Sequence, residues 1–138
     1  EIKYFAAKRD LQLVYAFQED QIHVNMDPEK TTLAFVNLLT NAIRFSPEGS
    51  ELVIGATEQG DQILAWVQDN GIGIPADQLQ KIFEEFYQIG STDQPRYSGL
   101  GIGLTIAKGI IEAQGGKLWA ESEGEGTGST LKVTFPAA

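Results

Sequence analysis

The segment from Asp27 to Phe45 constrains the fold of this chain most strongly, because it predicts one long amphipathic helix. An aspartate followed by a proline is typical of a helix start, with the carboxylate as N-cap and the proline at the first helical position. Apolar side chains then follow at spacings of i, i+3, i+4 and i+7, at Phe35, Leu38, Leu39 and Ala42. A stripe of this kind requires another layer to cover it.

Strand and helix patterns alternate along the rest of the chain. Strands are predicted at 11–17, 21–24, 51–57, 63–68, 117–121 and 129–135, with a hairpin turn at 59–61. Further helices are predicted at 75–83 and 102–114. This order predicts an α+β domain, a two-layer sandwich with about three helices on one face of a mostly antiparallel mixed sheet. Residues 1–10 are interpreted as the tail of an upstream helix or a linker, and residues 11–138 as the domain.

Length and composition narrow the class of protein. The chain has 138 residues, 42% of them hydrophobic, which suits one domain with a sizeable core. A formal net charge of −9 argues against nucleic acid and anionic lipid as partners. No apolar run is long enough to span a membrane, so we expect no direct membrane contact. The absence of cysteine excludes a thiolate metal site. Because the chain begins at Glu1, we interpret it as a piece of a longer protein.

Two asparagines on the predicted helix are the first candidate site residues. Asn37 and Asn41 are one helical turn apart, so they share one face. An amide oxygen can ligate Mg²⁺ and an amide N–H can bond a phosphate oxygen, but neither is a strong general base. The pair therefore suits the binding of a metal nucleotide, although it is also compatible with an ordinary solvated helix face.

Three glycine-rich segments accompany the asparagines. The first, Asp69–Pro75, follows a strand, and Asp69 could accept a hydrogen bond from an exocyclic amine such as that of adenine. A plain Asp-Asn-Gly turn is the alternative. The second, Gly99–Leu104, opens a helix whose free N–H groups favour an anion, or is simply a glycine-rich helix entry. The third, Gly124–Thr130, taken alone is typical of a hairpin loop.

Together these segments resemble the catalytic ATP-binding domain of sensor histidine kinases. That family lies in the superfamily of gyrase, heat-shock chaperone and mismatch-repair ATPases, and the resemblance implies its Bergerat-type ATP-binding fold. It covers roughly residues 22–136. The matching segments are an N box at Asn37–Ser46, glycine boxes at Asp69–Pro75, Gly99–Lys108 and Gly126–Ser129, and an F box at Ile82–Tyr87.

The resemblance implies ATP and Mg²⁺ as cofactors and gives each matching position a role. Asn41 would ligate the metal, Asn37 and Arg44 would meet the phosphates, and Asp69 would accept from the adenine amine. The other residues expected at the nucleotide are Phe45, Gly71, Gly73, Ile74, Gly99, Leu100, Gly101, Ile102, Gly103, Leu104 and Ser129. Residues 87–98 would form an ATP lid. Many relatives carry a basic residue after the F box, where this chain has Gln88, so Arg96 is the better lid candidate.

Asn37 also distinguishes branches of the superfamily. Hydrolysing relatives carry a glutamate there, and an amide cannot take a proton from water. The resemblance therefore implies a protein-histidine kinase, with Asn37, Asn41 and Arg44 as its catalytic residues. The acceptor histidine would lie on a separate helical dimerisation domain, which serves a response regulator. His23, in a strand-like run, does not fit that acceptor.

A cytoplasmic location is expected for this domain, whether or not the parent protein is anchored in a membrane. The alternative function is a regulatory module that binds nucleotide, or nothing, without transferring phosphate. For Phe83 both a core position and docking of the helical domain are compatible with the sequence, and the same holds for Phe86.

Overall fold

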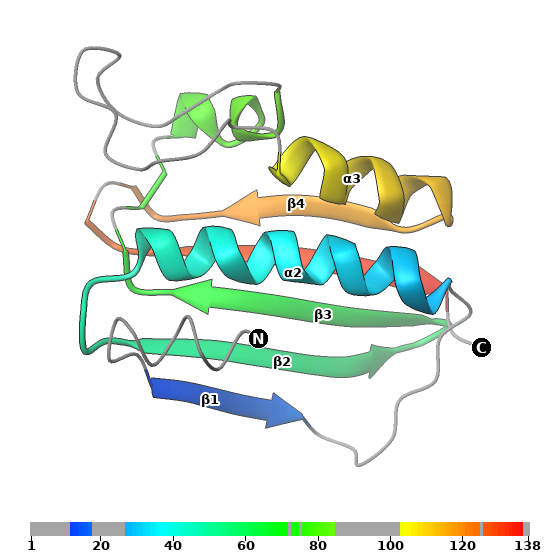
Figure 1. Cartoon of the computed structure of the whole chain (residues 1–138), viewed down its shortest axis with the longest axis horizontal. Coiled ribbons are helices and arrows are strands. Elements are labelled where there is room, and N and C mark those ends of the chain that lie inside the picture. The colour runs from blue at the N-terminus through cyan, green and yellow to red at the C-terminus, as the bar shows by residue number, and fades with distance from the viewer. Residues whose placement is uncertain are drawn as a thin grey trace.

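The computed structural model describes residues 12–17, 27–71, 73–74, 76–84, 103–124 and 126–136. Over these residues the chain forms two layers, with two α-helices lying on one face of a five-stranded sheet (Figure 1). This arrangement confirms the predicted α+β sandwich. Within the same residues, no helix combines the length and the apolar character needed to cross a membrane.

Helix α2, Pro28–Phe45, follows the predicted bounds. Its N-cap is Asp27, whose Oδ1 accepts hydrogen bonds from the backbone N–H groups of Glu29 at 3.0 Å and Lys30 at 3.1 Å. These two bonds satisfy donors that a helix start otherwise leaves unpaired. The helix ends at Ser46, whose hydroxyl donates to the carbonyl oxygen of Ala42 at 2.7 Å.

The sheet is mixed but mostly antiparallel, as predicted. Its order is β1-β2-β3-β5-β4, in which β1 runs parallel to β2 and every other neighbouring pair is antiparallel. The strands are β1 Gln12–Phe17, β2 Glu51–Gln59, β3 Gln62–Asp69, β4 Lys117–Glu121 and β5 Ser129–Pro136. Gly60 forms the predicted β2–β3 turn with φ of +62°. The strand predicted at 21–24 lies outside the described residues.

The helix predicted from residue 75 through Phe83 is wrong. The segment instead contains two short 3-10 helices, η1 Ala76–Gln78 and η2 Lys81–Phe83. No residue of η1 is buried, whereas Ile82 and Phe83 of η2 are. Two tight turns let the chain change direction between them, so η2 reaches the core while η1 stays at the surface.

Helix α3, Gly103–Ala113, runs antiparallel to α2. It ends where Gly115 adopts φ of +83°, as the glycine pair predicts. The amide of Gln114 joins this end to the start of α2. Its Oε1 accepts from the backbone N–H of Asp27, and its Nε2 donates to Thr31 Oγ1 at 3.0 Å. The two helices are therefore held together at the end of α3, and the start of α3 lies farther along α2.

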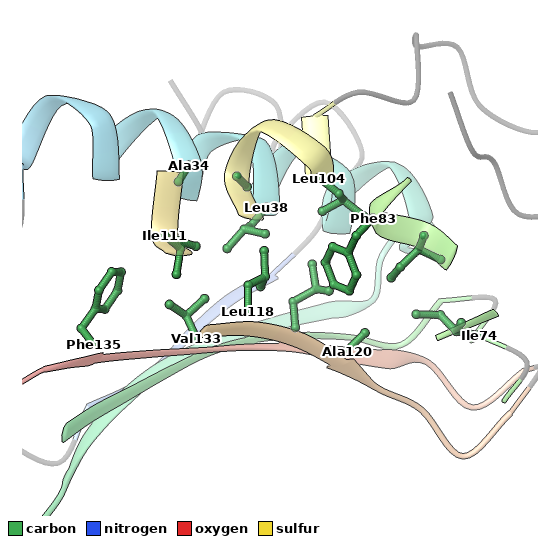
Figure 2. Packing of buried hydrophobic residues seen from close by; sticks show 13 residues of the cluster. Ala34, Leu38, Ile74, Phe83, Leu104, Ile111, Leu118, Ala120, Val133 and Phe135 are labelled. Atoms are coloured by element: carbon green, nitrogen blue, oxygen red, sulfur yellow. The ribbon is translucent and has the colours of Figure 1, made fainter. Parts of the chain in front are cut away.

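The core fills the space between the helices and the sheet. In Figure 2, Leu38 of α2, Ile111 of α3 and Phe83 of η2 lie opposite Leu118, Val133 and Phe135 of the sheet. Phe83 is therefore a core residue. A second cluster joins α2 to β2 and β3 and consists of Ala42, Ile43, Leu52 and Val67, with Leu39 packed against it.

Candidate functional site

The described site residues come from four elements. The second half of α2, the end of β3 and the start of β5 lie at the left of Figure 1, and α3 begins nearer the middle of the view. The antiparallel pairing of β3 with β5 brings Asp69 opposite Ser129. The antiparallel course of the two helices brings the start of α3 to the asparagine face of α2.

Asn37 and Asn41 lie half buried on α2, beside its apolar stripe. Gly103, the first residue of α3, faces Asn37. A Cβ built on this glycine would lie 3.8 Å from both Cβ and Cγ of Asn37, which is ordinary van der Waals contact. The carboxamide of Asn37 thus lies where the unpaired N–H groups of the α3 N-terminus begin. Amide groups and helix N–H groups together suit an anion accompanied by a metal.

Asp69 is the centre of the other half of the site. Asp69 is only 4% exposed, although its side chain carries a carboxylate. Oδ1 accepts from the backbone N–H of Gly71 at 2.8 Å and from that of Ser129 at 3.3 Å. Oδ2 accepts from the hydroxyl of Ser129 at 2.8 Å. Ser129 therefore lies against Asp69, and the carboxylate is held in one orientation.

Burial raises the pKa of Asp69 above its ordinary value of 3.8, and the hydrogen bonds from Gly71 and Ser129 lower it in part. The dominant cause is the loss of water around the charge. A carboxylate in such a place is a strong acceptor for any donor that replaces the missing water. An exocyclic amine is a donor of this kind.

The first and third glycine segments pack directly on each other around Asp69. Gly73 has φ of +75°, and a Cβ added there would collide with the carbonyl oxygen of Gly124. Gly128 has φ of +77°, and a Cβ there would collide with the carbonyl oxygen of Asp69. The backbone N–H of Gly128 also donates to the carbonyl oxygen of Gly71 at 3.2 Å. Glycine is required at both positions by the backbone conformation and by this close approach.

Two predicted nucleotide residues place their side chains in the core. Ile74 and Leu104 are 4% and 8% exposed, and both belong to the main hydrophobic cluster. Their side chains therefore contribute packing, and only their backbones remain for a ligand. The backbone N–H of Ile74 already donates to the hydroxyl of Ser122 at 3.0 Å.

Ser122 and Thr105 are two residues that the sequence reasoning missed. The hydroxyl of Ser122 joins the first glycine segment to the third. The hydroxyl of Thr105, on α3, donates to the carbonyl oxygen of Phe83 at 2.7 Å. Lys108 adds a cation–π contact, with Nζ 4.9 Å from the centroid of the Phe83 ring. These contacts attach η2 to the start of α3. The Ser122 position in the run Glu-Ser-Glu-Gly signals only a turn.

Several predicted positions fall outside the described residues. They are the side chains of Arg44 and Phe45, all of His23, Phe86, Gln88 and Arg96, the proposed lid at 87–98, and the glycine-segment residues Gly99, Leu100, Gly101 and Ile102. The roles expected for them stay predictions.

Comparison with known proteins identifies the family. Residues 26–138 match the family model described as "Histidine kinase-, DNA gyrase B-, and HSP90-like ATPase". The chain therefore belongs to this family of ATPases, and the resemblance to the catalytic ATP-binding domain of sensor histidine kinases is confirmed.

The relatives are sensor kinases much longer than this chain. Sensor histidine kinase WalK of Bacillus subtilis (strain 168) is 33% identical over 131 residues, which is 94% of this chain and 21% of the relative. Sensor protein kinase WalK of Staphylococcus haemolyticus (strain JCSC1435) is 35% identical over 133 residues, which is 94% of this chain and 22% of the relative. The chain thus spans about a fifth of the length of these curated relatives.

Solved structures share the fold. The nucleotide-free catalytic domain of histidine kinase ThkA is 25% identical with a TM-score of 0.84, over 99% of this chain and 85% of that one. Full-length ShkA in complex with AMPPNP is 24% identical with a TM-score of 0.83, over 99% of this chain and 28% of that one. At 24% identity, the similarity to ShkA shows a shared fold and nothing more.

Proposed function

We propose that this domain binds Mg·ATP and donates the γ-phosphoryl group to a histidine on a separate dimerisation domain. The observation that carries the proposal is the position of Gly103 beside the Asn37 side chain, which sets an amide, and not a carboxylate, at the start of α3. The Asp69–Ser129 pair supplies a second, separate recognition point at the end of β3. The two points suit the two ends of one nucleotide.

The residues present fit the cofactors. Asp69 keeps a buried carboxylate that can accept from the adenine amine, and Gly73, at positive φ, packs against the backbone of Gly124 in the neighbouring segment. Asn41 would give Mg²⁺ one amide oxygen, the type of ligand that this ion accepts alongside phosphate oxygens and water. Bound there, Mg²⁺ would neutralise charge on the phosphates. Asn37 and the N–H groups of α3 would hold the phosphate oxygens, with Arg44 as a further cation.

The amide at Asn37 favours transfer over hydrolysis. The side chain of Asn37 cannot accept a proton from water in the way that a glutamate could. Phosphoryl transfer depends mainly on positioning and on charge neutralisation, and both are within reach of the groups named above. The domain would therefore retain ATP until an acceptor side chain arrives.

The acceptor and the signalling partners would belong to the rest of the parent protein. We propose that residues 11–138 form the catalytic domain and that residues 1–10 lead into it from the dimerisation domain, which would pass the phosphoryl group to a response regulator. ATP is plentiful in the cytoplasm, so the domain would act there, whether or not the parent crosses a membrane. Nucleic acid and lipid are not expected as partners of a domain with a net charge of −9.

A transfer assay separates this function from a regulatory module that does not transfer phosphate. The purified chain is mixed with the dimerisation domain of its parent protein and ATP labelled on the γ-phosphate. We expect label on the dimerisation domain, and none when its histidine is replaced. Without the partner, steady-state phosphate release should stay near background. Several turnovers per second that Asn41→Ala abolishes would identify an ATPase, and ATP binding with no label transferred would identify the regulatory module.

A further inference from the structure

The hydroxyl of Ser122 lies at the junction of the two glycine segments that surround Asp69. It accepts from the backbone N–H of Ile74 at 3.0 Å and from that of Gly124 at 3.2 Å. Its one proton is donated to the carbonyl oxygen of Gly128 at 2.7 Å, and the carbonyl oxygen of Gly124 lies farther away, at 3.3 Å. One side chain thus connects Ile74 of the first glycine segment with Gly124 and Gly128 of the third.

These bonds fix the third glycine segment in its place over the first. The carbonyl oxygen of Gly124 occupies the space that a Cβ of Gly73 would need, so the two backbones are in direct contact. Ser122 bonds Gly124 on one side of this contact and Ile74 on the other. Without the hydroxyl, two part-buried N–H groups would lose their acceptor, and an unpaired buried donor is costly.

The same hydroxyl influences Asp69 indirectly, through the peptide bond that joins Gly128 to Ser129. Gly128, which Ser122 holds by its carbonyl oxygen, is followed by Ser129, whose N–H and hydroxyl both bond the Asp69 carboxylate. The α-carbon of Gly128 also packs against the carbonyl group of Asp69, where no side chain would fit. A shift of Gly128 would therefore move the donors that orient the carboxylate.

We propose that Ser122 is a positioning residue that sets the Asp69–Ser129 pair for recognition of the nucleotide base. The inference rests on the proposed function, in which Asp69 accepts from the adenine amine. The hydrogen-bond partners of Ser122 lie in the two glycine segments, and the asparagine pair lies on α2. Loss of the hydroxyl thus acts on selectivity for the base more than on binding of the phosphates.

The test compares ATP with GTP, because guanine has a carbonyl oxygen where adenine has its amine. Dissociation constants for both nucleotides are measured by calorimetry on the purified chain and on Ser122→Ala. The ratio of the GTP constant to the ATP constant should fall by about 5- to 100-fold, the range expected when a buried hydrogen-bond partner is lost. A purely structural role would weaken both nucleotides equally and leave the ratio unchanged.

Three further variants sharpen the test. Ser122→Thr keeps the hydroxyl and should restore the ratio. Thr32→Val removes an exposed hydroxyl near the start of α2, one that donates to the carbonyl oxygen of Pro28 at 2.7 Å, and should leave the ratio unchanged. If Ser122→Ala does not fold, Ser122→Cys takes its place. Its thiol has the branching of the hydroxyl but is only a weak donor and acceptor, so the ratio should again fall.

The outcomes separate this inference from the proposed function. A parent chain that prefers ATP, with an unchanged ratio in Ser122→Ala or Ser122→Cys, overturns the role of Ser122 alone. An equal fall of the ratio in Thr32→Val does the same, because loss of a hydroxyl far from Asp69 would then suffice. A parent chain that binds no ATP overturns the proposed function, and one that binds ATP and GTP equally overturns the recognition role of Asp69 and this inference with it.

Discussion

Replacement of Asp69 by asparagine should weaken ATP binding while the domain stays folded. In the parent, Oδ1 accepts from two backbone N–H groups and Oδ2 accepts from the hydroxyl of Ser129. The oxygen of an asparagine can keep the two backbone bonds. Its NH₂ group can face Ser129, because a hydroxyl can rotate and accept. The hydrogen bonds of the nucleotide-free domain therefore survive Asp69→Asn, and the buried charge disappears.

The nucleotide would meet a different group. An amide NH₂ in place of Oδ2 presents a donor to the adenine amine, which is itself a donor. Hydrogen bonds to charged groups contribute about 1.5–3 kcal/mol, so affinity for ATP should fall by roughly 10- to 150-fold. Affinity for GTP should change less, because the guanine carbonyl oxygen can accept from the new NH₂. The preference for ATP over GTP would shrink accordingly.

Calorimetry with ATP and GTP measures the predicted change in nucleotide affinity. Asp61→Asn is the matched control. Asp61 is an exposed aspartate in the β2–β3 turn, at the opposite end of β3 from Asp69, so it loses the same charge away from the site. An unchanged ATP affinity in folded Asp69→Asn, or an equal loss in Asp61→Asn, would refute the adenine assignment.

The pH dependence of the unfolding free energy tests the effect of burying the Asp69 carboxylate. Burial raises the folded-state pKa of Asp69 above 3.8, so the ionised carboxylate costs stability. The protonated carboxyl avoids that cost. Relative to Asp69→Asn, the parent should therefore gain unfolding free energy as the pH falls through the raised pKa toward 3.8, and lose it as the pH rises. Denaturant unfolding of both proteins across this interval gives the difference, and the opposite sign would contradict the assigned cause.

Four other variants test separate parts of the structure. Asn41→Ala should remove the Mg²⁺-dependent part of ATP affinity without lowering the melting temperature, and calorimetry with and without Mg²⁺ would refute the metal assignment if that dependence persists. Gly128→Ala should destabilise the fold by about 3 kcal/mol or more, because φ is +77° and the new Cβ collides with backbone. Gly109→Ala, exposed on α3 with open space around it, should instead stabilise by about 0.5–1 kcal/mol in the same denaturant titration, and a loss there would show that the glycine argument is wrong. Thr105→Val should cost about 1 kcal/mol of unfolding free energy, because the bond to the Phe83 carbonyl is lost, and no loss would mean that this bond does not stabilise η2.

The sequence predicts best what local chemistry decides. The start of α2 is fixed by Asp27 and the proline after it, and the hairpin turn by Gly60, so both are readable from neighbouring residues. The segment 76–83 misleads because its apolar residues have helical spacing, while contacts with the core break it into two turns. Ser122 could not be found because its partner Ile74 is 48 residues away and is only a backbone N–H. Gln114 bonds the start of α2 across 83 residues or more and gives no local signal either.

The Asp69–Ser129 pair and the start of α3 are held in place by different kinds of contact. The Asp69–Ser129 pair is fixed by the register of β3 on β5 and by glycine contacts that tolerate no Cβ, so the acceptor geometry exists before any ligand arrives. The start of α3 depends on helix packing, with Gln114 at the far end of the helix and Thr105 near its beginning. A rigid acceptor suits the base, which does not change during phosphoryl transfer. Keeping a carboxylate buried there costs free energy, and a donor from a bound base would offset that cost.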